Sequence, residues 1–187
     1  MLRTGNTSAW DSWVVASGNI LEDPERPGKY LMFYEGGHQV KSGTIRWSVG
    51  LAYGDSPAGP WTKHPGNPIV QGNKSACDKS LPCPQDCCQW PDCAGFYVGN
   101  VMYGPHTNNE FWLYAEAPVG LCCDQGPMAL WTSKAATGPF THRAYVLGVP
   151  SHGWDAGGYS ESKVAFSNGL CECLCYLCAW PSVCERA

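Results

Sequence analysis

Cysteine is the residue type with the most obvious chemistry in this sequence. None of the 12 cysteines precedes Ala76; seven lie in the middle of the chain and five near its end. The middle group, from Cys77 to Cys123, lies among Pro, Asp, Gln and Lys residues and has no paired C-x-x-C spacing. We therefore interpret it as a disulfide-stapled loop rather than a zinc site. Disulfides need an oxidising compartment, so this pattern predicts a secreted, extracellular protein.

Two further features bear on export, and they point in opposite directions. The N-x-S sequons Asn6-Thr7-Ser8 and Asn73-Lys74-Ser75 agree with a secreted protein. In contrast, the first four residues, Met1 to Thr4, are not followed by the apolar core of a signal peptide. Either the true N-terminus lies upstream of these residues or the prediction of export is wrong.

Composition excludes several classes of protein. Lys and Arg total 12 against 16 Asp and Glu, which gives a net charge of −4 without a basic cluster, so we expect no nucleic-acid partner. The longest apolar runs have about five residues, far fewer than the roughly 20 that cross a membrane, so we expect no membrane partner. A hydrophobic content of 44% predicts a folded chain, and 22 Gly with 15 Pro argue against long helices.

A repeat organises the chain. Residues 19–35 align without a gap on residues 100–116, at an offset of 81 positions. Further along, the Gly-Pro-Trp-Thr segment at 59–62 recurs as Gly-Pro-Phe-Thr at 138–141. A third start lies at Trp154-Asp155, which matches Trp10-Asp11. Because each Asp follows a Trp, we interpret Asp11 and Asp155 as residues of a structural turn or strand end, with catalysis as the alternative.

The repeat predicts an all-β fold. Once a Cys-rich insert at 77–93 is removed, the period is about 63 residues, with units at about 10–76, 90–150 and 154–169. Short strands follow one another in each unit, and those at 30–34 and 111–115 are apolar on both faces, as expected for sheets packed between neighbours. We expect an incomplete β-propeller of about two blades plus the start of a third. The alternative is a β-sandwich with coincidental internal similarity.

The length predicts a fragment. Propellers have roughly four to eight blades, so units of about 63 residues cannot close a ring within 187 residues. We therefore expect residues 1–169 to form a partial propeller domain. After residue 169 the composition changes abruptly, and we interpret 170–187 as an aberrant Cys-rich tail from a truncated or misread gene end. A metal-binding cysteine tract is the alternative, although its spacing fits no familiar zinc pattern.

Several segments resemble the five-bladed β-propeller glycoside hydrolases, most closely glycoside hydrolase family 43 and its relatives in families 32, 68 and 130. The matching segments are Gly28 to Tyr34, Gly50 to Pro57, Gly59 to Pro68 and Trp154 to Glu161. With the second repeat they cover about two thirds of the chain. The resemblance is more specific for the fold than for a substrate.

The resemblance implies a funnel in which the innermost strand of each blade aims one residue at a central pocket. Such enzymes use an Asp base, a second Asp that tunes a pKa and a Glu general acid. Glu161 matches the acid, whereas Asn100 stands at the place of the pKa-tuning Asp and Ser17 at the place of the base. We therefore expect Glu161 to be the proton donor, leave the base unassigned, and keep Asp11 and Asp155 as further catalytic candidates.

Sugar binding would use aromatic faces against C–H surfaces and polar groups against hydroxyls. The expected substrate-binding residues near the inner strands are Trp13, Asn19, Tyr97, Asn100, Trp154 and Tyr159. We expect no metal ligands and no cofactor; the resemblance allows only a structural calcium ion or a histidine in the channel. His106 is the candidate for that histidine, but a single histidine in a loop is usually just exposed, so we do not assign it.

The function implied by the resemblance is hydrolysis of arabinosides, xylosides or fructosides in oligosaccharides or polysaccharides. Two alternatives stay open. One is a non-catalytic, secreted carbohydrate-binding module, because two of the three inner-strand places lack a carboxylate. The other is an inactive gene fragment without a stable fold of its own.

Overall fold

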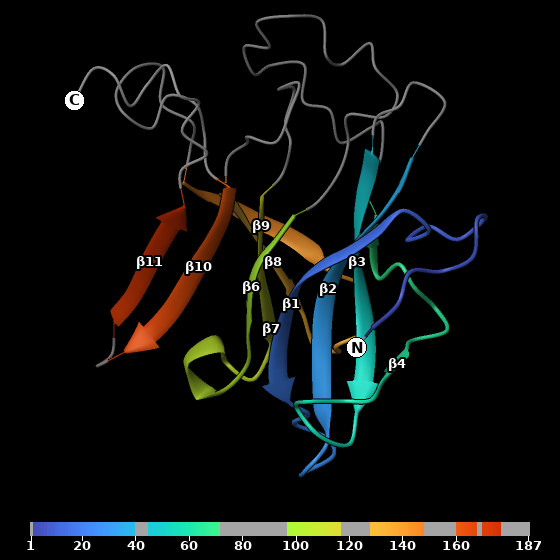
Figure 1. The fold of residues 1–187 in the computed structure, drawn as a ribbon. Coiled ribbons are helices and arrows are strands. Elements are labelled where there is room, and N and C mark those ends of the chain that lie inside the picture. Colours follow the sequence, from blue (N-terminus) through green and yellow to red (C-terminus); the bar gives the residue numbers. More distant parts are fainter. Residues whose placement is uncertain are drawn as a thin grey trace, which may run out of the picture.

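The computed structural model describes residues 2–39, 45–71, 97–116, 128–147, 160–167 and 170–176. Within these ranges the chain forms eleven β-strands, one short 3-10 helix and no α-helix. Every strand pairing is antiparallel. The strands form three separate sheets, which follow one another along the chain (Figure 1).

The first sheet is a meander of neighbouring strands. Its order is β1-β2-β3-β4, with β5 pairing on β3. The β1–β2 turn is built by Asp23, whose Oδ1 accepts a hydrogen bond from the Glu25 backbone, and by Gly28 at a φ of 75°. The bounds of these strands are β1 Val14–Glu22, β2 Tyr30–Gln39, β3 Ile45–Gly54, β4 Trp61–Lys63 and β5 Val70–Gln71.

The second sheet repeats this meander, and the third contains a single hairpin. The second has the order β6-β7-β8-β9, and the third consists of β10 and β11. The 3-10 helix η3 lies between β6 and β7. The bounds are β6 Tyr97–Met102, η3 Pro105–Thr107, β7 Phe111–Glu116, β8 Met128–Ser133, β9 Thr141–Leu147, β10 Ser160–Ser167 and β11 Leu170–Tyr176.

Strand register confirms the internal repeat. Asn19 pairs with Phe33 in the first sheet, and Asn100 pairs with Tyr114 in the second, so both partners are shifted by the same 81 positions. The recurring Gly-Pro turn is also the same in both sheets: Gly59 and Gly138 have φ values of 84° and 82°, and each precedes a cis proline. Equivalent sequence segments therefore occupy equivalent places in two copies of one sheet.

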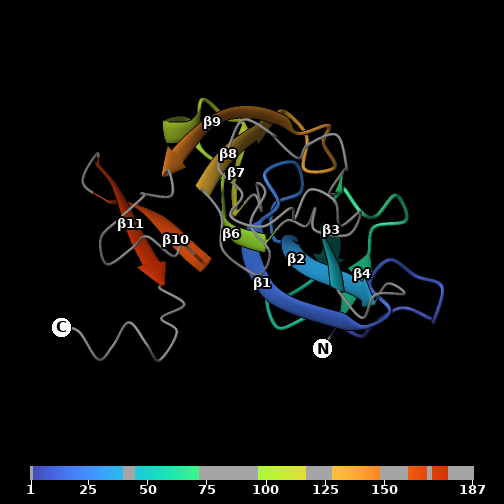
Figure 2. The same cartoon turned by 90° about the horizontal axis from the view of Figure 1, so that it is seen from above.

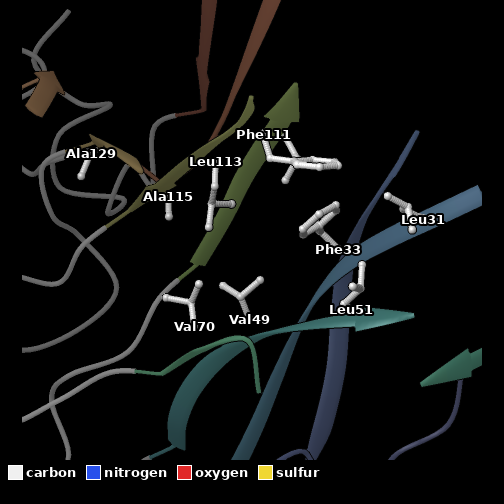
Figure 3. Packing of buried hydrophobic residues seen from close by; sticks show 10 residues of the cluster. Leu31, Phe33, Val49, Leu51, Val70, Phe111, Leu113, Ala115 and Ala129 are labelled. Atoms are coloured by element: carbon white, nitrogen blue, oxygen red, sulfur yellow. The ribbon is translucent and has the colours of Figure 1, made fainter. Parts of the chain in front are cut away.

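The main core lies between the first and second sheets. Leu31, Phe33, Val49 and Leu51 of the first sheet are fully buried in one cluster with side chains of the second (Figure 3). The rings of Phe33 and Phe111 lie 6.0 Å apart across this interface. The residues contributed by the second sheet are Val101, Phe111, Leu113, Ala115 and Ala129.

Both sheets are also apolar on their other faces. Met32 and Tyr34 alternate with Leu31 and Phe33 along β2, and they pack in a second cluster with Ala52. Tyr114 and Met128 form a third cluster on the far face of the second sheet. Each strand that was predicted to be apolar on both faces is thus packed on two sides, as in stacked propeller blades.

Figure 2 shows the three sheets fanning out from the region where β1, β6 and β10 lie close together. The described residues therefore form two propeller blades and the first two strands of a third, which confirms the predicted all-β fold class. The sequence repeat predicts an end at residue 169, but residues 170–176 form β11 and supply the second strand of the third blade. The cysteines of this segment alternate with larger residues, and Cys behaves as a small apolar residue that a strand accommodates. The predicted insert at 77–93 lies outside the described residues.

Candidate functional site at the inner strands

The innermost strands of the three blades lie next to one another. β1 and β6 are joined by the amide of Asn19, whose Nδ2 donates to Oδ1 of Asn100 at 2.5 Å. β10 lies beside β6 on the other side (Figure 2). Two of the predicted sugar-binding residues, Asn19 and Asn100, are therefore in direct contact, and both are half-buried. Their amides offer neutral hydrogen-bonding groups where the first two blades meet.

Each inner strand is interrupted by a β-bulge. In β1, Ala16 pairs with Glu35 and Asn19 with Phe33, so Ser17 and Gly18 together lie opposite one residue of β2. The β6 register shifts between Val98 and Asn100, and the β10 register shifts between Ser160 and Lys163. Glu161 and Ser162 are the two residues within the β10 shift. All three bulges fall at equivalent repeat positions.

The first bulge changes which face of the blade the strand presents. Val15 packs in the cluster on the outer face of the first sheet, whereas Leu21 packs against the core shared with the second. Six positions separate these residues, and an uninterrupted strand would place both on the same face. The extra residue at the bulge reverses this alternation. Asn19 and Leu21, on the same face after the bulge, therefore face the second blade, which is why Asn19 reaches Asn100.

Ser17 has an unusual backbone conformation in this bulge. Its φ is 46°, in the left-handed region that non-glycine residues rarely adopt. The neighbouring Gly18 is exposed, and a Cβ there would lie 3.0 Å from Sδ of Met32. The backbone of the inner strand is thus strained at the repeat position that holds Glu161 in β10.

Asp11 lies in a different environment. It is 2% exposed and accepts hydrogen bonds from Nζ of Lys63 on β4 and, at 3.3 Å, from the hydroxyl of Tyr34 on β2. These partners lie on the face of the first sheet that is turned away from the second blade. No described contact joins Asp11 to Asn19 or Asn100. This arrangement supports the structural interpretation of Asp11, while its catalytic role stays a prediction.

Tyr34 extends the polar group around Asp11. Nδ2 of Asn67 donates to the Tyr34 hydroxyl at 3.1 Å and to the carbonyl of Leu51 at 2.9 Å, and the Leu51 amide donates back to Asn67. Burial, followed by the charge of Asp11 and its hydrogen bond, raises the pKa of the Tyr34 phenol far above its ordinary value. The phenol therefore stays protonated and holds the N-terminal segment on the sheet.

A buried carboxylate also lies beside the first bulge. Glu35 is 2% exposed and pairs with Ala16, the residue before the bulge, while Glu116 has the same position opposite Tyr97 in the second sheet. Glu35 and Glu116 are aligned with each other in the sequence repeat. Since the pair recurs at the same level in both blades, we interpret it as part of the blade architecture.

The structure describes only some of the other predicted site residues. Trp13 is 57% exposed at the start of β1, where its backbone amide donates to the carbonyl of Gly37 at 2.9 Å. Glu161 belongs to strand β10, and Tyr97 is the first residue of strand β6. His106 is exposed in η3, after the end of β6 that lies farther from the bulge. Trp154, Asp155 and Tyr159 lie outside the described residues.

Two features of this region were not predicted from the sequence. One is the bulge, which had a signal: a glycine inside a strand pattern often marks a bulge, and Ser17-Gly18 and Val98-Gly99 place one at the same point of two repeats. The other is Lys63, the partner of Asp11. Their separation of 52 positions gave no sequence signal.

No group of three or more His, Cys, Asp or Glu side chains that could hold a metal ion occurs among the residues described above. The structural calcium ion stays a prediction. In the same part of the chain there is no helix long and apolar enough to cross a membrane.

Comparison with known proteins finds similarity among solved structures. No family model matches the sequence, and no curated protein matches it. Among solved structures, the chain is similar to an exo-beta-1,3-galactanase from Clostridium thermocellum, with a TM-score of 0.47 and 17% sequence identity. The similarity covers 81% of this chain and 29% of the galactanase, so the chain spans less than a third of that enzyme's length.

Proposed function

We propose that the inner strands form the hub of a glycoside hydrolase-like site that binds and cleaves carbohydrate. The observation that carries this proposal is the bulge shared by β1, β6 and β10 at one repeat position. Bulges are frequent beside active sites, where they redirect a side chain. In this chain the shared position brings Ser17 and Glu161 to equivalent places on the first and third blades, with the Asn19–Asn100 contact beside them.

The reaction would be hydrolysis of a glycosidic bond in an arabinoside, xyloside or fructoside. Glu161 would give its proton to the oxygen of the leaving group as the C–O bond breaks, and water would complete the exchange at the sugar carbon. The base that activates the water is unassigned. Trp13 and the two amides would contact the sugar through an exposed aromatic face and neutral hydrogen-bonding groups.

The test is turnover of aryl glycosides and natural oligosaccharides of arabinose, xylose and fructose by the full chain and by Glu161→Gln. We expect Glu161→Gln to lose about 100-fold or more in turnover of oligosaccharides, whose leaving groups need a proton. Dinitrophenolate is a leaving group that needs no protonation, so the cleavage of dinitrophenyl glycosides should fall much less.

Glu172→Gln, on the neighbouring strand β11, is the matched control and should cleave both kinds of substrate like the unmodified chain. Equal losses for both leaving groups would remove the proton-donor role from Glu161. Unchanged turnover in Glu161→Gln would remove the residue from the site.

A second candidate function is carbohydrate binding without cleavage. It is favoured by Ser17 and Asn100, a hydroxyl and an amide at the two inner-strand places where the resembled enzymes carry carboxylates. Retained binding of an oligosaccharide by calorimetry, with no turnover of any substrate in the panel, would favour this function. If the unmodified chain neither binds nor cleaves any carbohydrate in the panel, the proposed site is overturned.

A further inference from the structure

The strained serine in β1 is the feature that the proposed site does not yet explain. Ser17 has a φ of 46°, whereas the next residue, Gly18, could adopt a positive φ without a steric penalty. A glycine at position 17 would remove the strain. Strained backbone residues persist where the surrounding structure holds them, and they occur frequently at sites that bind or react.

The surroundings of Ser17 place it at the hub rather than in the core. The residue is half-buried, lies outside the regular β1–β2 register, and is two positions from Asn19, which contacts the second blade. The same bulge position holds Glu161 in β10. Ser17 is therefore the first blade's counterpart of the expected proton donor, and its hydroxyl can both donate and accept a hydrogen bond.

We propose that Ser17 is a ligand-contacting residue of the hub, whose hydroxyl binds a hydroxyl of the carbohydrate and whose strained backbone is kept for that contact. This inference rests on the proposed function and adds a specificity-determining residue to it. A single hydroxyl side chain suits a polyhydroxylated, uncharged ligand, because it adds no charge and matches donors with acceptors.

The test combines two variants that affect the backbone differently but both remove the hydroxyl. Ser17→Gly relieves the backbone strain and should raise Tm, while Ser17→Ala keeps the strained φ and should not raise it. Both should weaken binding of arabino-, xylo- or fructo-oligosaccharides about three- to tenfold in isothermal titration calorimetry, the effect of one neutral hydrogen bond. Reduced binding together with higher stability is a result that a purely structural role cannot produce.

Asn109→Gly provides the matched control. Asn109 has a φ of 56° in the turn after η3, following the end of β6 that is farther from its bulge. This variant should raise Tm without changing oligosaccharide binding.

Each outcome of the experiment supports or overturns the inference. Unchanged binding in both Ser17 variants would overturn it while leaving the proposed function intact. A lower Tm for Ser17→Gly would also overturn it, because serine would then be kept for local stability. If the unmodified chain binds none of the three oligosaccharides, the proposed function fails and this inference fails with it.

Discussion

The hydroxyl of Tyr34 shows how a buried polar side chain can tie the stability of this chain to pH. The group is 1% exposed and contacts Asp11 and Asn67. Burial and the neighbouring carboxylate oppose a negative charge on the phenol, which is why its pKa is raised. Below pH 10 or so, the phenol is protonated in both the folded and the unfolded chain, so its contribution to stability is fully present.

Above that pH the unfolded chain releases the proton and the folded chain keeps it, so the free energy of unfolding falls as the pH rises. For one proton the fall approaches about 1.4 kcal/mol per pH unit. We expect Tyr34→Phe, which lacks this group, to lose stability less steeply between pH 9 and pH 11 than the unmodified chain. Urea unfolding at several pH values measures both slopes.

Tyr103→Phe is the comparison for this experiment, because Tyr103 packs against the core shared by the two blades and not in the cluster that contains Tyr34. The difference in slope between the two variants isolates the effect of the Tyr34 surroundings. Parallel slopes for Tyr34→Phe and the unmodified chain would show that the Tyr34 phenol does not couple folding to pH.

The packing of the N-terminal segment on the first sheet depends on two glycines of that sheet. The ring of Trp10 lies directly over Gly36 and Gly50, where a Cβ would come within 2.3 Å and 2.8 Å of its ring carbons. The same ring lies 5.6 Å from that of Tyr34. Because the tryptophan occupies the space that side chains would fill, these glycines are needed for close approach rather than for backbone freedom.

We expect Gly36→Ala to lower the free energy of unfolding by about 3 kcal/mol, because Trp10 would have to move off the sheet. In the background of Trp10→Ala, the same change should cost much less, giving a coupling of about 1 kcal/mol or more in a double-mutant cycle. Denaturant unfolding of the four proteins measures this coupling.

Gly28→Ala serves as the comparison for this cycle. Gly28 has a φ of 75° and open space around its Cα, so alanine there meets only the backbone penalty of about 1–2 kcal/mol. That penalty should be the same with or without Trp10. Additive effects of Gly36→Ala and Trp10→Ala would contradict the close packing of the ring on the sheet.

At the level of elements, sequence predicts most where the repeat applies. The alignment of residues 19–35 with 100–116 predicted equivalent strands, and the identical register of Asn19 and Asn100 confirms it. The contact between Asp11 and Lys63 could not be predicted, because the two residues are 52 positions apart and meet only where the N-terminal segment crosses the sheet. The bulge could be predicted in part. Its glycines can be recognised in the sequence, but the strain at Ser17 is a property of the folded backbone.

At the scale of the molecule, the two complete blades are stabilised by a shared core. Leu113 is fully buried in it, together with Leu31 and Phe33 of the first blade (Figure 3). In repeat proteins each unit contacts only its neighbours, so the interface between units carries their cooperativity. A cavity at Leu113 should therefore weaken both blades, although the residue belongs to the second.

We expect Leu113→Ala to lower the free energy of unfolding by about 2–5 kcal/mol. Native-state hydrogen exchange should then show a similar loss of protection in β2 and β3 as in β7 and β8, because the blades open together. Val146→Ala, at a residue that is 42% exposed on β9, should change stability by only about 0.5 kcal/mol or less and leave protection unchanged. Lost protection confined to β7 and β8 would mean that the blades unfold independently, and a hub assembled from the inner strands of several blades would then lack the rigid frame that its chemistry requires.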